Sequence, residues 1–220
     1  MPARRVVFLG PPGTGKGTQA QSLARTRGLA AISSGDVLRA EIRGGSEIGR
    51  QADGFVRSGN LVPDEIVTGV MLTGLKRLPP DAGFTLDGFP RTVPQAEALA
   101  AGLAAMGARL DLVVDFVLAD DVIVRRIVGR RVCTKCNASY NTEFLPPRTD
   151  RVCDNCGTAL VQRVDDRADV IATRLQAYRV QTAPLVAYYE RLGLLRAVDA
   201  SRPADEVQRR VESLVDAVNG

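Results

Sequence analysis

Near its N-terminus the chain reads Val6-Val7-Phe8-Leu9-Gly10-Pro11-Pro12-Gly13-Thr14-Gly15-Lys16-Gly17-Thr18. The β-branched apolar run Val6–Leu9 predicts a buried strand, and Thr18–Arg27 has the composition of a helix that stops at Gly28. The glycines between them let the backbone turn with its N–H groups facing inward, and the N-terminus of the helix adds partial positive charge. This strand–turn–helix unit predicts a loop that binds nucleotide phosphates, with Lys16 reaching the β- and γ-phosphates.

The loop departs from the strict phosphate-binding motif at one position. That motif has Ser or Thr directly after the lysine, whereas Gly17 stands here and Thr18 follows. This departure leaves open whether a loop hydroxyl ligates magnesium. A glycine-rich turn without a ligand is the alternative, but it does not account for four glycines and a lysine in this context. The loop by itself specifies no more than a nucleotide phosphate.

Short apolar runs alternate with helical segments along the rest of the chain. The further runs that predict strands are Leu29–Ile32, Phe84–Leu86, Leu112–Leu118 and Leu194–Val198. The segments that predict helices are Asp64–Leu78, Val93–Met106, Asp121–Arg131, Asp169–Arg191 and Pro203–Val218. This alternation predicts an α/β fold in which five parallel strands form a sheet covered by helices on both faces.

Two segments interrupt the alternation. Residues 33–62 have a helical pattern punctuated by glycines, and residues 129–166 have few periodic apolar positions and contain all four cysteines. A chain of this length can bury a core of its own. We interpret both segments as insertions in a single domain, residues 1–220, whose core comprises residues 1–32, 63–128 and 167–220.

The composition excludes several classes of protein. Hydrophobic residues make up 45% of the chain and charged residues 25%, as in folded globular proteins rather than disordered ones. The absence of histidine excludes Ser-His-Asp hydrolysis, histidine metal sites and histidine acid–base catalysis. The net charge of +4 suits either nucleic acid or a small polyanion as a ligand.

The sequence contains no pattern typical of export or of a membrane anchor. The basic N-terminus, Met1–Arg5, is followed by an apolar stretch of only Val6–Leu9, shorter than a secretory signal needs. The longest apolar runs, within Leu112–Ala119, are far too short to span a bilayer. We therefore expect a cytoplasmic protein without a membrane partner.

The four cysteines form two pairs, Cys133-x-x-Cys136 and Cys153-x-x-Cys156, separated by sixteen residues. This spacing is typical of a tetrahedral zinc ribbon. Four thiolates complete the shell of the metal and leave no position for a substrate, so we expect the zinc to be structural. Two disulfides are the alternative, which the reducing cytosol disfavours.

Five motifs, in this order, resemble those of the adenylate kinases, members of the nucleoside-monophosphate kinase family. They are Gly10–Thr18 with its shifted threonine, Ile32-Ser33-Ser34-Gly35-Asp36-Val37-Leu38-Arg39, Leu86-Asp87-Gly88-Phe89-Pro90-Arg91-Thr92 with Gln95, Arg126-Ile127-Val128-Gly129-Arg130-Arg131, and Arg163-Val164-Asp165-Asp166. The resemblance covers essentially the whole chain. It implies a P-loop kinase in which residues 33–62 bind the monophosphate and residues 129–166 form a long, zinc-containing lid. The implied activity is reversible, magnesium-dependent phosphoryl transfer from ATP to AMP, giving two ADP, in adenine nucleotide homeostasis.

The resemblance also implies roles for individual residues. The implied catalytic residues are Lys16, Arg91, Arg130, Arg163 and Arg174. The residues implied to bind ATP are Gly13, Thr14, Gly15, Lys16, Gly17, Thr18, Arg126, Arg130, Ser139, Tyr140 and Arg202. The residues implied to bind AMP are Ser34, Arg39, Asn60, Leu61, Val62, Gly88, Phe89, Pro90, Arg91, Gln95, Arg163 and Arg174. Two of these differ from the common family pattern: Ser34 replaces threonine but keeps the hydroxyl, and Asn60 replaces lysine at a contact made mainly by the backbone.

Asp87 follows the predicted strand Phe84–Leu86, and ligands gather at the carboxyl ends of strands in open α/β sheets. We assign Asp87 to magnesium, through water, because this cation keeps much of its hydration shell. The alternative is an aspartate that stabilises the turn before Gly88.

Phosphoryl transfer requires positioning and charge stabilisation more than covalent catalysis. The attacking AMP phosphate oxygen is already ionised near neutral pH, so the absence of histidine is no obstacle. Arginine suits this task because its planar fork binds phosphate bidentately. Arg126 and Arg130 are four residues apart and share one helix face if the helix continues through both. For the remaining arginines of this region we expect a solvated surface, namely for Arg125, Arg131 and Arg167.

Two other functions compete with this interpretation. An arginine-rich zinc ribbon also suits a nucleic-acid-binding module, but Tyr140 and Phe144 are its only aromatic residues and form a poor stacking platform. Ser34 and the long lid favour AMP over UMP, CMP or GMP as the acceptor, and an assay with each acceptor would distinguish them. We expect ATP, AMP and ADP as partners and no nucleic acid, and we expect a monomer from the family resemblance alone.

Overall fold

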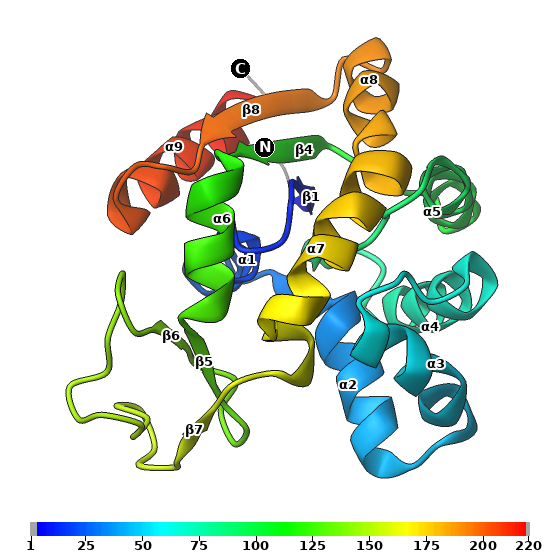
Figure 1. Ribbon diagram of the computed structural model, residues 1–220. Coiled ribbons are helices and arrows are strands. Elements are labelled where there is room, and N and C mark those ends of the chain that lie inside the picture. Colours follow the sequence, from blue (N-terminus) through cyan, green and yellow to red (C-terminus); the bar gives the residue numbers. More distant parts are fainter. Residues whose placement is uncertain (1–3, 219–220) are drawn as a thin grey trace.

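The computed structural model describes residues 4–218 and contains a central sheet of five strands in the order β2-β3-β1-β4-β8. Figure 1 labels β1, β4 and β8 of this sheet. The strands are β1 (Arg5–Leu9), β2 (Ala30–Ser33), β3 (Phe84–Asp87), β4 (Leu112–Val117) and β8 (Leu195–Asp199). Every neighbouring pair is parallel. The predicted five-stranded parallel sheet is therefore confirmed. Met1, Pro2 and Ala3 of the basic N-terminus lie outside the described residues.

β1 is the central strand and is buried on both faces. Val7 lies opposite Leu86 of β3 on one side and Val113 of β4 on the other. Successive side chains of a strand point to opposite faces, and both faces of β1 are covered, since Val6–Leu9 is at most 2% exposed. This explains why the segment is a continuous apolar run rather than an alternating one.

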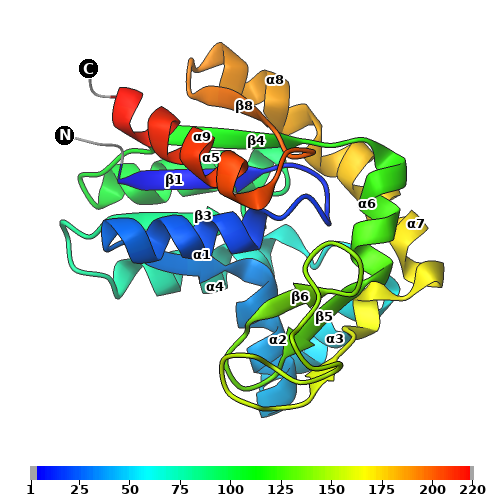
Figure 2. The same cartoon turned by 90° about the vertical axis from the view of Figure 1, so that its left-hand side faces the viewer.

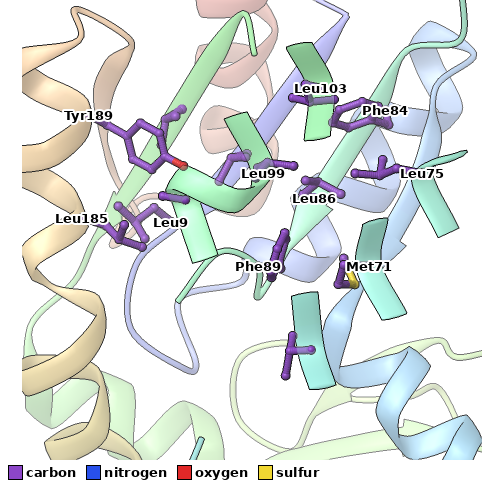
Figure 3. Close-up of a cluster of buried hydrophobic side chains, with 14 of the residues drawn as sticks. Leu9, Met71, Leu75, Phe84, Leu86, Phe89, Leu99, Leu103, Leu185 and Tyr189 are labelled. Atoms are coloured by element: carbon purple, nitrogen blue, oxygen red, sulfur yellow. The ribbon is translucent and has the colours of Figure 1, made fainter. Parts of the chain in front are cut away.

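Helices cover the two faces of the sheet. α1 (Lys16–Arg27) and α9 (Ala204–Ala217) lie over the face that carries Val6 and Phe8 (Figure 2). The helices that pack on the opposite face, which carries Val7 and Leu9, are α4 (Asp64–Lys76), α5 (Val93–Ala105) and α8 (Pro184–Arg191). Figure 3 shows this second core, in which Leu86, Leu99 and Met71 meet between β3, α5 and α4. No helix within residues 4–218 combines the length and apolarity needed to cross a membrane.

Residues 33–62 contain two helices, α2 (Ser34–Gly44) and α3 (Glu47–Ser58). Each helix begins with a serine N-cap, because Ser33 Oγ accepts a hydrogen bond from the Asp36 N–H and Ser46 Oγ accepts one from the Gly49 N–H. The helices cross closely at Gly49, where a Cβ atom would lie 2.2 Å from the carbonyl oxygen of Glu41. The helical, glycine-punctuated pattern of this segment is confirmed.

The helix predicted over Asp121–Arg131 is shorter in the structure, where α6 covers Asp120–Val128. Gly129 packs against the following hairpin, because a Cβ atom there would lie 2.8 Å from Asn141 Oδ1. Arg130 therefore begins a strand. The helix does not continue through both arginines, so the condition for Arg126 and Arg130 to share one helix face is not met.

The rest of this segment is a small antiparallel sheet in the order β6-β5-β7. Its strands are β5 (Arg130–Cys133), β6 (Ser139–Asn141) and β7 (Leu160–Val161), followed by the 3-10 turn η1 (Val164–Asp166). Figure 2 shows β5 and β6 below the central sheet, on the side of its carboxyl-terminal edge.

The helix predicted over Asp169–Arg191 is also interrupted. α7 (Ala168–Ala177) widens into a π-helical turn, η2 (Tyr178–Thr182), before α8 begins at Pro184. The Ala183 N–H donates to the Tyr178 carbonyl at 2.8 Å, five residues back. Proline has no N–H and its ring clashes with the carbonyl four residues earlier, so a wider turn before Pro184 relieves the clash.

The bend after β1 provides a test of the fold. Gly10 has φ 132°, and a Cβ atom there would lie 2.6 Å from the carbonyl oxygen of Phe116 in β4. Gly10→Ala should lower the free energy of unfolding by about 3 kcal/mol or more, through backbone strain and overpacking together. The matched control is Gly28→Ala, since Gly28 also has positive φ but a Cβ atom there would meet no described atom within 4 Å. Gly28→Ala should lower the free energy of unfolding by only about 1–2 kcal/mol. Equal losses in urea unfolding of the two variants would contradict this packing.

Candidate active site

The predicted phosphate loop connects β1 to α1 and folds around its own lysine. Lys16 Nζ donates hydrogen bonds to the Pro11 carbonyl oxygen at 2.7 Å and to Thr14 Oγ1 at 3.4 Å. Burial lowers the pKa of Lys16 to about 8; Asp87 opposes this shift and the nearby arginines contribute to it. The lysine is thus held by neutral oxygens beside a cluster of cations, an environment that favours the arrival of an anion.

A cavity of about 580 Å³ opens at this loop and is lined by residues from segments far apart in the chain. It collects the loop, the start of α2, the end of α3, the turn after β3, and parts of α6, β6, α7 and the segment before α9. The predicted cationic residues that line it are Lys16, Arg39, Arg91, Arg126, Arg130, Arg163, Arg174 and Arg202. The other predicted residues that line it are Gly13, Thr14, Gly15, Gly17, Thr18, Ser34, Asn60, Leu61, Val62, Asp87, Gly88, Pro90, Gln95, Ser139 and Tyr140.

Two buried carboxylates after the small sheet hold the arginines on one side of the cavity. Asp166 is fully buried and forms ion pairs with Arg130 and with Arg174, the latter at 2.8 Å. Asp165 pairs with the same Arg174 at 3.1 Å. Burial alone would raise the pKa of Asp165, but the surrounding arginines, Arg174 first, outweigh it and hold this pKa below its usual value. In the sequence these two aspartates stood out only as part of a motif; the available signal was an acidic pair that begins two residues after Arg163.

A third carboxylate holds the arginines on the α2 side. Asp36 accepts a hydrogen bond from Arg39 at 2.7 Å and lies 3.7 Å from Arg163. Burial, with the repulsion of Arg130 and Arg39, lowers the pKa of Arg163 to about 10, so it remains charged at neutral pH. Asp36 was not among the predicted site residues.

The turn after β3 is closed around the carbonyl oxygen of Gly88. Ser34 Oγ donates to this oxygen at 2.6 Å, and Arg91 Nε donates to it at 2.8 Å. A side chain at Gly88 would lie 2.8 Å from Ser34 Oγ, so the turn needs glycine here. Burial and the nearby Arg174 lower the pKa of Arg91 to about 10, which leaves the group charged at neutral pH.

Gln95 links this turn to α4. Its Oε1 accepts a hydrogen bond from the Arg91 N–H at 2.7 Å, and its Nε2 donates to Asp64 Oδ1 at 2.7 Å. The other oxygen of Asp64 accepts from Thr92 Oγ1 at 2.6 Å. Asp64, at the start of α4, is thus a further residue of the site that the sequence did not suggest.

Asp87 lies at the carboxyl end of β3, next to the phosphate loop. A Cβ atom at Gly17 would lie 3.0 Å from Asp87 Oδ2. Gly17, which departs from the strict motif, therefore makes room for the Asp87 carboxylate. This carboxylate lies close to the helix backbone at the position where the strict motif has a Ser or Thr side chain. No hydrogen bond or ion pair occupies this carboxylate within the described part of the chain, so its oxygens fit a hydrated divalent cation.

An aromatic residue from the turn after β6 forms one wall of the cavity. The guanidinium carbons of Arg125 and Arg126 lie 5.4 and 5.3 Å from the centroid of the Phe144 ring. Arg126 also donates to the Ala200 carbonyl at 3.0 Å. Phe144 lines the cavity while remaining 42% exposed, so its ring is available for stacking.

One predicted residue, Phe89, does not line the cavity. Phe89 is fully buried in the hydrophobic core, so only its backbone can face a ligand. Arg202 lines the cavity, but its side chain is 67% exposed and pairs with Asp199. The arginines expected on the surface do not line the cavity, namely Arg125, Arg131 and Arg167.

The four cysteines of the small sheet meet at one point. Within residues 4–218 all four are free of disulfides, and their sulfur atoms lie within 4.8 Å of one another. Three of the Sγ–Sγ distances are 3.4, 3.5 and 3.6 Å. A tetrahedral zinc ion with Zn–S bonds of ~2.3 Å requires about 3.8 Å between sulfurs. The cluster therefore fits zinc.

The two cysteine pairs have the same backbone geometry. In the first, the Cys133 N–H donates to the Ala138 carbonyl and the Asn137 N–H donates to the Cys133 carbonyl; in the second, Cys153, Thr158 and Gly157 repeat both bonds. The residue after each second cysteine is left-handed, with φ 58° at Asn137 and 70° at Gly157. Two matching turns that present four sulfurs to one point form a preorganised metal site.

Comparison with known proteins agrees with this geometry. The family model described as adenylate kinase matches residues 8–194. The adenylate kinase of Geobacter sulfurreducens is 47% identical over 98% of this chain and 99% of its own length. Those of Pelobacter propionicus and Methanosarcina barkeri are 45% and 42% identical, each over 96% of this chain and over 96% and 97% of their own lengths. The phosphate loop, the arginine-lined cavity and these matches together place the chain in the adenylate kinase family.

Proposed function

We propose that the chain transfers the γ-phosphoryl group of ATP reversibly to AMP, giving two ADP, and that the predicted residues hold the two nucleotides in this one cavity. The observation that carries the proposal is the convergence of the phosphate loop with arginines from separate elements around a single space. Two nucleotides and a transition state bring several negative charges together, and a fixed cationic site stabilises them.

The cavity has two sides that suit the two nucleotides. On one side, residues 13–18, Arg126, Arg130, Ser139, Tyr140 and Arg202 are assigned to ATP. On the other, Ser34, Arg39, residues 60–62, residues 88–91 and Gln95 are assigned to AMP. Arg163 and Arg174 lie between them and are assigned to the AMP and transferring phosphates. The domain boundaries given above follow the same division, with residues 33–62 closing on AMP and residues 129–166 on ATP.

In the reaction, an oxygen of the AMP phosphate attacks the γ-phosphorus of ATP. The new O–P bond forms as the bond to the β-phosphate oxygen breaks, and ADP leaves. The attacking oxygen is already ionised, so the protein needs no general base. Lys16, Arg91, Arg130, Arg163 and Arg174 orient the reacting groups and stabilise the charge on the transferring phosphoryl.

Asp87 would hold magnesium through water, because its carboxylate adjoins the phosphate loop and has room there. Magnesium, when bound with ATP, neutralises charge on the phosphate oxygens. The cysteine cluster would hold one structural zinc, with four thiolates and no open position. Neither metal is needed to supply a nucleophile.

We further propose that the protein is a cytoplasmic monomer that binds neither nucleic acid nor membranes. A coupled assay with AMP, UMP, CMP and GMP as acceptors tests the central assignment, with ATP as the donor. The expected result is ADP formation with AMP far exceeding that with the other three. A parent protein that binds oligonucleotides tightly at physiological salt, but makes no ADP from ATP and AMP, would overturn the proposal.

Arg91 tests the AMP side. Arg91→Ala should lower kcat/KM for AMP by at least about a hundredfold, because this arginine contacts phosphate in both the ground and transition states. The far-UV spectrum and zinc content should be unchanged, since Arg91 lies outside the hydrophobic core and the cysteine cluster. The matched control is Arg167→Ala, because the Arg167 side chain is 67% exposed and away from the cavity. A loss of less than tenfold in Arg91→Ala would show that Arg91 does not have this role.

Lys16 tests the ATP side through pH. Its pKa of about 8 in the free protein should rise when phosphates bind, because an adjacent anion favours the charged ammonium. At pH 9 most of the free protein lacks this proton, so ATP binding should take up close to one proton from the buffer. Calorimetry of ATP binding in two buffers of different ionisation enthalpy measures this uptake.

The control for the pH experiment is Lys16→Met. This variant should take up no proton and should lose about a hundred- to a thousandfold in turnover. Equal binding heats for the parent protein in the two buffers at pH 9 would refute the assigned role of Lys16.

The cysteine cluster predicts stoichiometric zinc. Protein purified without chelators should contain about one zinc per chain, and removal of the metal should lower the unfolding temperature, since metal binding to the folded state stabilises that state. Cys136→Ser should weaken retention of the metal. Protein without metal in elemental analysis, or with cysteines found as disulfides, would show the zinc assignment to be wrong.

A further inference from the structure

Tyr140 occupies an unexpected place in the small sheet. It lies on β6, is only 8% exposed, and packs in a cluster with Cys133, Cys153 and Leu160. Its hydroxyl oxygen lies 2.9 Å from the backbone nitrogen of Asp154 and 3.6 Å from Cys153 Sγ. The hydroxyl therefore points to the cysteines, although other atoms of the residue line the nucleotide cavity.

The two contacts of the Tyr140 hydroxyl determine which of them receives its proton in a hydrogen bond. A backbone N–H can only donate, so the Tyr140 oxygen accepts from Asp154. The hydroxyl proton is then free for the other partner, Cys153 Sγ. A metal-bound cysteine is a thiolate and has no proton to give. The Tyr140 O–H therefore donates to the sulfur of Cys153.

Other donors accompany this one around the cluster. Thr158 Oγ1 lies 3.4 Å from Cys156 Sγ, and its hydroxyl can donate once this sulfur is a metal-bound thiolate. The Cys136 N–H points to Cys133 Sγ at 3.5 Å. A zinc ion with four thiolates carries a net charge of −2, so donors around the sulfurs stabilise it. Of these three donors, Tyr140 is the one on β6, the strand that faces the nucleotide cavity.

The strand that carries Tyr140 is tied to the cavity wall by its next residue. Asn141 Nδ2 donates to the Arg126 carbonyl at 2.8 Å, and Asn141 Oδ1 accepts from the N–H groups of Glu143 and Phe144 at 2.9 and 3.0 Å. Arg126 and Phe144 both line the cavity. One short strand thus contacts a metal-binding sulfur through Tyr140 and the nucleotide wall through Asn141.

We infer that Tyr140 is a positioning residue of the metal site, whose hydroxyl donates to the Cys153 thiolate and so joins the zinc cluster to the strand that shapes the nucleotide wall. The inference rests on the proposed zinc site, but it makes claims that need no nucleotide and no activity. Outer hydrogen bonds to metal ligands commonly change metal affinity by about 10–100-fold.

Zinc release measures the effect of this hydrogen bond. In Tyr140→Phe, which keeps the ring and removes the donor, release of zinc to a chromophoric chelator should be at least about tenfold faster than in the parent. The matched control is Tyr188→Phe, which removes a phenol hydroxyl from a partly buried residue that packs against the hydrophobic core, away from the cysteines. It should release zinc at the parent rate. Metal content is determined first, so that a parent without zinc would indicate failure of the zinc assignment itself.

Cobalt supplies a signature that a purely structural role would not change. With Co²⁺ in place of zinc, a hydrogen bond to a thiolate lowers the energy of its lone pair and moves sulfur-to-cobalt charge transfer to higher energy. Tyr140→Phe should therefore move this absorption to longer wavelength, and Tyr188→Phe should leave it unchanged. Zinc release within twofold of the parent, together with an unchanged cobalt spectrum, would overturn the inference.

A second measurement keeps the test decisive if Tyr140→Phe does not fold. The parent chain can be produced with 3-fluorotyrosine at all four tyrosines, which makes each phenol a stronger donor without removing any contact. The cobalt spectrum reports only a tyrosine that contacts a ligand sulfur. Its charge-transfer band should move to shorter wavelength, and an unmoved band would contradict the hydrogen bond to Cys153.

Discussion

The ion pairs of Asp165 and Asp166 with Arg130 and Arg174 hold the active site together. Several guanidinium groups lie close together and largely out of water, and like charges in that environment repel strongly. The two carboxylates, one of them fully buried, give these cations hydrogen-bonded partners before any substrate arrives. The cavity can therefore stay open and charged, because the carboxylates of Asp165 and Asp166, rather than solvent, balance the charge of its cations.

The sheet determines where this charge is placed. All five strands are parallel, so their carboxyl ends lie on one edge, where the phosphate loop follows β1 and Asp87 ends β3. The close contacts of Gly10 with β4 and of Gly17 with Asp87 hold the loop against its neighbours. A preorganised loop of this kind needs little rearrangement when phosphate binds, which is the condition for strong electrostatic stabilisation.

The small sheet belongs to a segment that has few apolar side chains. Its core consists mainly of two cysteines, Tyr140 and Leu160, too few side chains to stabilise a fold by burial alone. A zinc ion bound by the four converging thiolates, as proposed, would provide a crosslink in place of a larger core. The hydroxyl of Tyr140 and the side chain of Asn141 would then join that crosslink to Arg126 and Phe144 in the cavity wall.

The local sequence was sufficient to predict the elements and motifs that depend on interactions between residues close in sequence. The run Val6–Leu9 and the glycine-rich loop predicted a strand, turn and helix, and the cysteine spacing predicted a metal cluster, because backbone conformation and ligand spacing depend on near neighbours. Tertiary structure decided the rest. Contact of Gly129 with the following hairpin ended α6 early, and Asp36, Asp64, Asp165 and Asp166 became site residues only when folding brought them to arginines and amides distant in sequence. The direction of the Tyr140 hydroxyl was decided in the same way, since a side chain that can face either a nucleotide or a sulfur is oriented by partners that only the folded chain supplies.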